Sequence, residues 1–226
     1  MSPDAPIQKS DRQALSPCLS LIHIYPQPGP YADAIRAAEK AGTEYWGIWN
    51  ILAFREDAAS NLCELSHQVM FEEAPISQAL RELIAAYTSS LNRCDFCRNA
   101  HAAVASHLYG SEEFVRSVLD DPDKSRLDER EKALLRFVRK LTLDSGAVTE
   151  GDIEMLKRGG WDETSIYYAI YACALFNFYN RFVSGNGVKL VSDAAFRRLS
   201  ERMARNGYKM CIRDRSSTLR TNSSLP

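Results

Sequence analysis

The chain has 226 residues, 45% of them hydrophobic and 25% charged, and this balance predicts a folded globular protein with a real core. Its 28 basic and 29 acidic residues give a formal net charge of −1, so no net field attracts nucleic acid or an anionic membrane. The longest apolar runs are too short to span a bilayer. We therefore expect neither a nucleic-acid nor a membrane partner.

The two ends of the chain carry short peptides that are related through their coding DNA. Residues 19–24 read LSLIHI, and residues 210–215 read MCIRDR. The reverse complement of a back-translation of the first peptide, shifted by one base, encodes Met-Cys-Ile-Arg-Asp. The pair resembles translated read-through of a transposon end used in sequencing libraries. We predict that residues 1–24 and 210–226 are non-native flanks and that residues 25–209 form a single domain.

Hydrophobic residues recur at helical spacing through the middle of the chain, and no window alternates long enough to predict a strand. Pro30 is a typical first residue of a helix, Arg55 interrupts the next apolar stretch, and Ser77 is a typical N-cap. The helices expected in this half are 31–41, two within 45–71, 78–91, and one from 93 or 94 to 109.

Capping residues also mark the helices of the second half. Asp128 with Glu131 predicts a capping box, and Thr149 with Asp152 predicts another N-terminal cap. The helices expected here are 112–119 after Ser111, 129–143, 150–158 before two glycines, 163–183 after Asp162, and 192–206. The chain is therefore predicted to be all-α.

The cysteines indicate a cellular compartment. Of the six, only Cys94 and Cys97 are close in sequence, whereas a secreted disulfide scaffold is usually shorter and denser in cysteine. Pro17 and Pro26 bracket the apolar stretch 18–25, and no small-x-small cleavage site follows it, so it does not resemble a signal peptide. We expect a cytoplasmic protein, in which a CxxC pair is more often catalytic or metal-binding than structural.

Residues 92–104, NRCDFCRNAHAAV, are the strongest candidate for a site. Helical spacings of three, four and seven place Cys94, Cys97 and His101 on one face. The start of the helix offers unpaired N–H groups and the positive end of the dipole, both of which favour a thiolate. A histidine one turn beyond Cys97 can take its proton.

Glu82 is a candidate third member of this site. It lies in the preceding helix, which a short turn near Asn92 would fold antiparallel to the motif helix. Leu80, Leu83 and neighbouring apolar residues would then face the core and leave the carboxylate semi-buried. A buried carboxylate near a histidine can orient the imidazole or pass a proton through water.

The pattern Glu82-x11-Cys94-x2-Cys97-x3-His101 resembles the signature of alkylhydroperoxidase D-like proteins in the carboxymuconolactone decarboxylase superfamily. The flanking residues 80–105 and the later segment 160–182 are similar to the peroxidase-related branch. The resemblance covers roughly residues 45–190. It implies an all-α alkylhydroperoxidase D-like helical fold with a helical hairpin that carries the CxxC pair at a helix N-terminus.

The resemblance also implies residue roles. Cys97 matches the cysteine that attacks the peroxide and becomes a sulfenic acid, and Cys94 matches the proton donor that then closes the disulfide. His101 matches the base and Glu82 the relay carboxylate. Some members carry a second histidine between the cysteines, where this chain has Phe96, which implies a shorter relay and weaker activity. Other members of the superfamily are decarboxylases that lack the cysteine pair, so the fold alone assigns no chemistry.

Two classes of function follow. The first is a thiol-dependent peroxidase for organic hydroperoxides. No segment of the sequence resembles a nucleotide- or flavin-binding loop, so no cofactor is expected. An external dithiol protein or small thiol would then have to reduce the enzyme. The resemblance implies a homo-oligomer, trimeric or a multiple of three. The alternative is a non-catalytic helical module with a zinc site or a redox-sensing thiol pair. Zinc usually takes four ligands, and Glu82 is the sole candidate for the fourth.

The remaining cysteines, histidines and aromatic residues are interpreted as structural. Cys63 and Cys173 are expected in the core, and His67 and His107 at the surface or at helix ends. Polar residues in the apolar helix 163–183 are expected to point inward or to contact a partner subunit; they are Asn177, Asn180 and Arg181. The aromatic residues expected in core and interface positions, some of them lining a pocket for an apolar peroxide tail, are Trp46, Trp49, Phe54, Phe176, Phe178 and Tyr179.

Overall fold

The computed structural model describes residues 28–208, and within this range the chain forms ten α-helices, two short 3-10 turns and no strand. The predicted all-α class is therefore confirmed. The two flanks predicted to be non-native lie outside the described residues, as do Cys18 and Cys211. The helices are α1 (Pro30–Lys40), α2 (Ile48–Leu52), α3 (Glu56–Met70), α4 (Gln78–Leu91), α5 (Asp95–Tyr109), α6 (Glu112–Asp120), α7 (Glu129–Leu143), α8 (Glu150–Arg158), α9 (Glu163–Gly185) and α10 (Asp193–Asn206).

The helix boundaries follow the capping residues of the sequence. Arg55 is the N-cap of α3, and the Ser77 hydroxyl accepts a hydrogen bond from the Leu80 N–H at 3.1 Å at the start of α4. Thr149 and Asp152 form the capping box of α8. Several boundaries differ from expectation by one or two residues. The helix α1 is shifted by one residue, α6 ends at Asp120, α9 continues to Gly185, and α5 and α10 start at Asp95 and Asp193.

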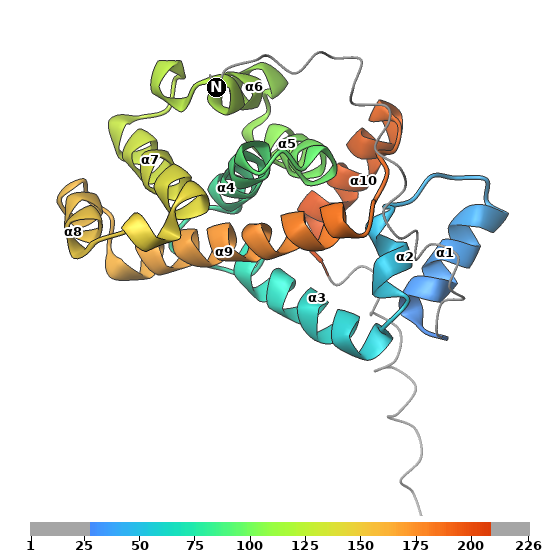
Figure 1. Ribbon diagram of the computed structural model, residues 1–226. Helices are drawn as coiled ribbons and strands as arrows, with labels where there is room; N and C mark the ends of the chain where they lie inside the picture. Colours follow the sequence, from blue (N-terminus) through green and yellow to red (C-terminus); the bar gives the residue numbers. More distant parts are fainter. Residues whose placement is uncertain (1–27, 209–226) are drawn as a thin grey trace, which may run out of the picture.

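The hairpin of α4 and α5 occupies the centre of the molecule (Figure 1). Its two helices pack along each other, with α6, α7, α9 and α10 packed around them. The turn between them is Asn92–Arg93, and Arg93 adopts the left-handed conformation with φ 56°. The Asn92 side chain donates hydrogen bonds to the amide oxygens of Asn177 and Asn180, which ties the turn to α9. The predicted antiparallel hairpin is therefore present.

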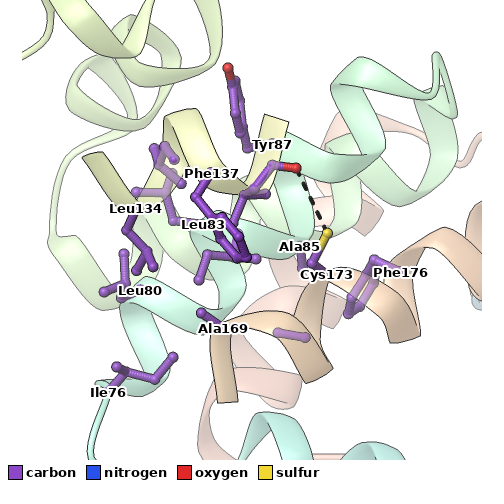
Figure 2. Close-up of a cluster of buried hydrophobic side chains, with 14 of the residues drawn as sticks. Ile76, Leu80, Leu83, Ala85, Tyr87, Leu134, Phe137, Ala169, Cys173 and Phe176 are labelled. Atoms are coloured by element: carbon purple, nitrogen blue, oxygen red, sulfur yellow. Dashed lines mark hydrogen bonds between the residues drawn. The ribbon is translucent and has the colours of Figure 1, made fainter. Parts of the chain in front are cut away.

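Buried side chains form two main hydrophobic clusters. The larger joins α4, α7 and α9, and Figure 2 shows side chains from all three helices within it, among them Leu83, Phe137 and Phe176. The smaller joins α1, α2, α10 and the start of α5, and it includes Trp46, Phe96 and both motif cysteines. Burial of a large apolar side chain stabilises the fold by about 1.5–3 kcal/mol. Together the two clusters fix α5 from both sides.

The outer surface of the described helices is largely polar. Even α9, the 23-residue helix, does not combine length and apolarity in the way a membrane span requires, and the same holds for every other helix between residues 28 and 208. A few large apolar side chains are nevertheless exposed, among them Tyr167 and Phe178 on α9 and Met155 on α8.

Candidate active site

The two motif cysteines lie at the N-terminus of α5. Cys94 is the N-cap residue, and Cys97 lies in the first turn. The Cys94 N–H donates to the Ser89 carbonyl at 2.9 Å, and the Cys94 carbonyl accepts from the Arg98 N–H at 2.9 Å, so the backbone around Cys94 is held on both sides. Each cysteine is 3% exposed. Both thiols are therefore buried beside the N–H groups and the positive end of the helix dipole.

The thiols of this pair are electrostatically unequal. A hydrogen bond from Cys97 lowers the pKa of Cys94 to about 6, against the opposing effect of burial, and the Cys97 N–H, the Ser184 hydroxyl and His101 lower it further. The same hydrogen bond and burial raise the pKa of Cys97. Because the two groups share one proton, they titrate as a pair. The hydrogen bond therefore favours the thiolate form of Cys94 and the protonated form of Cys97 in the reduced pair.

His101 and Glu82 form a buried dyad next to the cysteines. His101 comes from α5 and Glu82 from α4, and their Nδ1 and Oε2 atoms are 2.6 Å apart. Glu82 is completely buried and His101 is 7% exposed. An imidazole that donates its Nδ1–H to a carboxylate keeps Nε2 as the nitrogen that can exchange a proton. The neighbouring-helix arrangement expected for these two residues is therefore present.

Tyr208 is a third member of this group that the sequence did not indicate. Its hydroxyl donates to Glu82 Oε1 at 3.0 Å, and its ring lies nearly parallel to the His101 ring, with centroids 6.4 Å apart. Phe176 packs edge-on against the imidazole from another side, at 4.2 Å between centroids. Tyr208 is separated from Glu82 by 126 residues, so no local spacing pattern links them.

No direct hydrogen bond joins His101 to either thiol among the contacts of residues 28–208. When it is protonated, His101 also favours the Cys94 thiolate through its charge. Cys97 and His101 also line the same cavity, which has a volume of about 90 Å³. A proton that moves between the dyad and the thiol pair therefore needs a bridging molecule, such as a water or a bound substrate.

The walls of this cavity are mainly aromatic. Trp46 packs against the ring of Phe96 at 5.7 Å in an edge-on geometry, and both residues line the space beside Cys97. The aromatic residues Trp49, Phe176 and Tyr179 also line it, in agreement with the expected apolar pocket, whereas Phe178 is exposed. Cys63 is buried as expected, and it lines the cavity too. The cavity thus offers an apolar environment that opens onto Cys97 and His101.

Asn180 of α9 connects the cysteine pair to the hairpin turn. Its amide nitrogen donates to the Ser89 hydroxyl at 2.8 Å, and its amide oxygen accepts from Asn92 at 2.9 Å. A hydrogen bond between Asn180 and Cys97 partly offsets the raised pKa of that thiol. Asn180 therefore points inward, which is one of the two arrangements expected for it. The side chain of Arg181, in contrast, is exposed and bonds Asn177.

The other candidate residues lie where a structural interpretation places them. Cys173 is fully buried in the larger cluster (Figure 2), and His107 is exposed near the end of α5. His67 is partly buried, and its Nδ1 accepts a hydrogen bond from the Tyr208 N–H at 3.3 Å. Across the described part of the chain, no three His, Cys, Asp or Glu side chains are arranged to hold a metal ion. A zinc site built on the CxxC pair therefore has no ligand set in this geometry.

Comparison with known families agrees with this architecture. Residues 56–140, which include α4, α5 and all four predicted site residues, match the model of the carboxymuconolactone decarboxylase family. The segment that carries the predicted site is therefore that of a carboxymuconolactone decarboxylase family protein. No curated protein matches the chain significantly.

Solved structures of alkylhydroperoxidase D-like and peroxidase-related proteins share the fold of this chain. An uncharacterized peroxidase-related protein from Silicibacter sp. TM1040 is 25% identical, with a TM-score of 0.67 over 79% of this chain and 93% of that one. An alkylhydroperoxidase core protein from Ralstonia eutropha JMP134, also uncharacterized and peroxidase-related, is 24% identical, with a TM-score of 0.66 over 80% and 93%. The debrominase Bmp8 shares the fold at 17% identity, with a TM-score of 0.59 over 90% and 98%.

Proposed function

We propose that this protein is a thiol-dependent peroxidase that reduces hydroperoxides, organic ones in particular, through Cys94 and Cys97. The observation that carries the proposal is the hydrogen-bonded cysteine pair at the start of α5, of which Cys97 lines an apolar cavity together with a carboxylate-bound histidine. The match to the family model and the likeness to a peroxidase-related protein support it. The cysteine usage favours a cytoplasmic location, where cellular dithiols would keep the pair reduced.

The inequality of the two thiols suggests the first step. The Cys97 proton moves along the shared hydrogen bond to the Cys94 thiolate, which leaves a thiolate on Cys97 at the cavity wall. This thiolate attacks the distal oxygen of the hydroperoxide and breaks the O–O bond. The Cys94 thiol returns the proton to the departing alkoxide, which leaves as an alcohol. Cys97 is then a sulfenic acid, and Cys94 is again a thiolate.

The second step closes a disulfide. The Cys94 thiolate attacks the Cys97 sulfur, and the sulfenic oxygen leaves as hydroxide, which takes up a proton to form water. One hydroperoxide and two thiols thereby give one alcohol, one water and one disulfide. An external dithiol protein or small thiol reduces the disulfide and restores the pair. No bound cofactor takes part in this sequence.

The dyad supplies protons during these steps. Glu82 holds the Nδ1 side of His101, so Nε2 is the nitrogen that exchanges a proton with the reacting groups through a bridging water or the substrate. Asn180 donates to the Cys97 sulfur and stabilises the negative charge that develops there before attack. The aromatic walls hold the organic part of the substrate and limit the access of bulk water.

A peroxide-consumption assay with excess dithiothreitol tests this proposal. Wild type should turn over cumene hydroperoxide repeatedly, and Cys97→Ser and Cys94→Ser should each lose turnover. Cys173→Ser is the matched control, because Cys173 is buried in the larger cluster, away from the cavity. Oxidation of one pair per chain without turnover would indicate a redox-sensing module instead. The absence of any thiol loss under peroxide would contradict both functions.

A further inference from the structure

The chain turns sharply after α10, at Gly207. This residue has φ 66° and ψ −153°, a backbone conformation that L side chains rarely adopt. A Cβ at this position would lie 2.5 Å from His67 Nδ1 and 2.6 Å from Phe71 Cγ. The close approach to α3 and the backbone conformation therefore both require glycine. The turn directs Tyr208 back toward the hairpin.

The backbone of Tyr208 is fixed on both sides by α3. Its N–H donates to His67 Nδ1 at 3.3 Å, and its carbonyl accepts from the Cys63 thiol at 2.6 Å. The hydroxyl then reaches Glu82 in the interior, where burial and the nearby carboxylate raise the pKa of Tyr208 well above its usual value. The phenol therefore remains protonated and donates its hydrogen to the carboxylate.

The carboxylate of Glu82 has a defined partner for each oxygen. Oε1 accepts from Tyr208 at 3.0 Å, and Oε2 lies 2.6 Å from His101 Nδ1. One partner on α5 and one in the turn after α10 leave the carboxylate one orientation, and a buried oxygen without its partner would be costly. The Tyr208 ring also lies against one face of the imidazole, with Phe176 against its edge.

We propose that Tyr208 is a positioning residue for His101, which acts by holding Glu82 and the imidazole in the orientation that keeps Nδ1 bonded and Nε2 available for proton exchange. Its hydroxyl is bonded to Glu82, so it works through the dyad. Its part in peroxide reduction rests on the proposed function above, whereas its effect on the imidazole does not.

A tautomer measurement tests this without any enzymatic assay. The 15N chemical shifts of His101 should show one dominant tautomer in wild type, protonated on Nδ1, and a mixture in Tyr208→Phe. Tyr109→Phe is the control, because the Tyr109 hydroxyl is buried on the same helix without a hydrogen-bond partner in the described chain, far from Cys97. An unchanged tautomer pattern in Tyr208→Phe would overturn the proposal, whether or not the protein is a peroxidase.

A double-mutant cycle gives the kinetic counterpart. Tyr208→Phe should slow single-turnover oxidation of the pair by peroxide about tenfold, the usual order for loss of one hydrogen bond to a charged group, with little change in KM. In a Glu82→Gln background, Tyr208→Phe should cause little further loss of rate, because the carboxylate that accepts the Tyr208 hydrogen bond is already absent. Equal effects in both backgrounds would show that Tyr208 acts independently of Glu82, and the proposal would be wrong.

The pH dependence of the single-turnover rate reflects every charged or titratable group near the Tyr208 hydroxyl. Glu82 and Arg81 contribute from α4, His101 from α5, and Tyr179 from α9. Only the limb that depends on His101 should change in Tyr208→Phe. A uniform loss of rate at every pH, with the shape of the profile preserved, would indicate a merely structural role.

Discussion

The cysteine pair differs from two independent thiols because one proton is shared between them. The lowered pKa of Cys94, about 6, depends first on the hydrogen bond from Cys97. The hydrogen bond thus favours a thiolate on the residue that resolves the disulfide in our scheme. The residue that attacks is the one at the cavity wall, and it gains its charge by a short proton transfer.

We predict that thiolate absorbance at 240 nm rises with a midpoint near pH 6 in the reduced protein. Cys97→Ala should raise this midpoint because the donor is lost, whereas Cys97→Ser keeps a hydroxyl donor and should raise it less.

Since the folded pKa of Cys94 lies below the ordinary value of 9, the thiolate stabilises the reduced fold fully above pH 9, and this stabilisation is lost as pH falls through 6. The Tm advantage of wild type over Cys94→Ser should therefore grow between pH 6 and 8. A midpoint near 9 in wild type would contradict the shared-proton arrangement.

His101 should influence the same chemistry through proton exchange. His101→Ala is expected to slow alkylation of Cys97 at pH 7 by a large factor, since a placed base contributes on the order of 10²–10⁴-fold. Raising the pH should restore the rate, because hydroxide replaces the base. Glu82→Gln should have a smaller effect of the same kind. Mass spectrometry assigns the alkylated cysteine, and equal rates for His101→Ala and wild type from pH 6 to 9 would exclude the relay.

At the scale of elements, the sequence predicts the hairpin well and its surroundings poorly. Capping residues such as Ser77, and the helical spacing of Glu82 and His101, are local signals, so α4 and α5 could be placed from them. Tyr208 and Ser184 contact the site from distant parts of the chain, and no local pattern encodes such contacts. The position of Phe96 between two aromatic neighbours likewise depends on helices whose packing the sequence did not specify.

The turn after α10 gives an element-scale prediction. Gly207→Ala should destabilise the fold by about 2–4 kcal/mol, because it combines left-handed strain with a clash against His67 and Phe71. Gly42→Ala is the matched control, because Gly42 has a similar φ of 62° but nothing within 4 Å of its Cβ position, and it should cost only about 1 kcal/mol. Denaturant unfolding measures both. Equal losses would show that the close approach of α3 is unimportant.

At the scale of the whole molecule, the site lies where the two hydrophobic clusters meet. Both cysteines belong to the smaller cluster, whereas Phe176 and Tyr179, which line the same cavity, belong to the larger one. A substitution at a cavity-lining residue of either cluster should therefore affect the cavity. The helices α4 and α5 hold the reacting groups rigidly because both clusters pack against them.

The exposed aromatic side chains of α9 bear on assembly. Tyr167 is 57% exposed and Phe178 47% exposed, although both lie on a helix that is otherwise largely apolar. The family resemblance predicts a homo-oligomer, trimeric or a multiple of three, and light scattering should then give a mass that is such a multiple of 25.4 kDa. Phe178→Glu should reduce the mass, whereas Met155→Glu, at a similarly exposed position on α8, should not. A monomeric wild type would refute this prediction.

The contact between Tyr208 and Glu82 also has a consequence for the order in which the site matures during synthesis. The hairpin is translated early, and its internal contacts are local, so α4 and α5 can pair while later helices are still being made. Tyr208 follows His101 by more than a hundred residues, a delay of about 5 to 20 s at ordinary rates of translation. A nascent chain therefore holds both thiols, the imidazole and the carboxylate before it holds the tyrosine that orients the dyad. We expect the thiol pair to react with peroxide at its full rate only after α10 has docked.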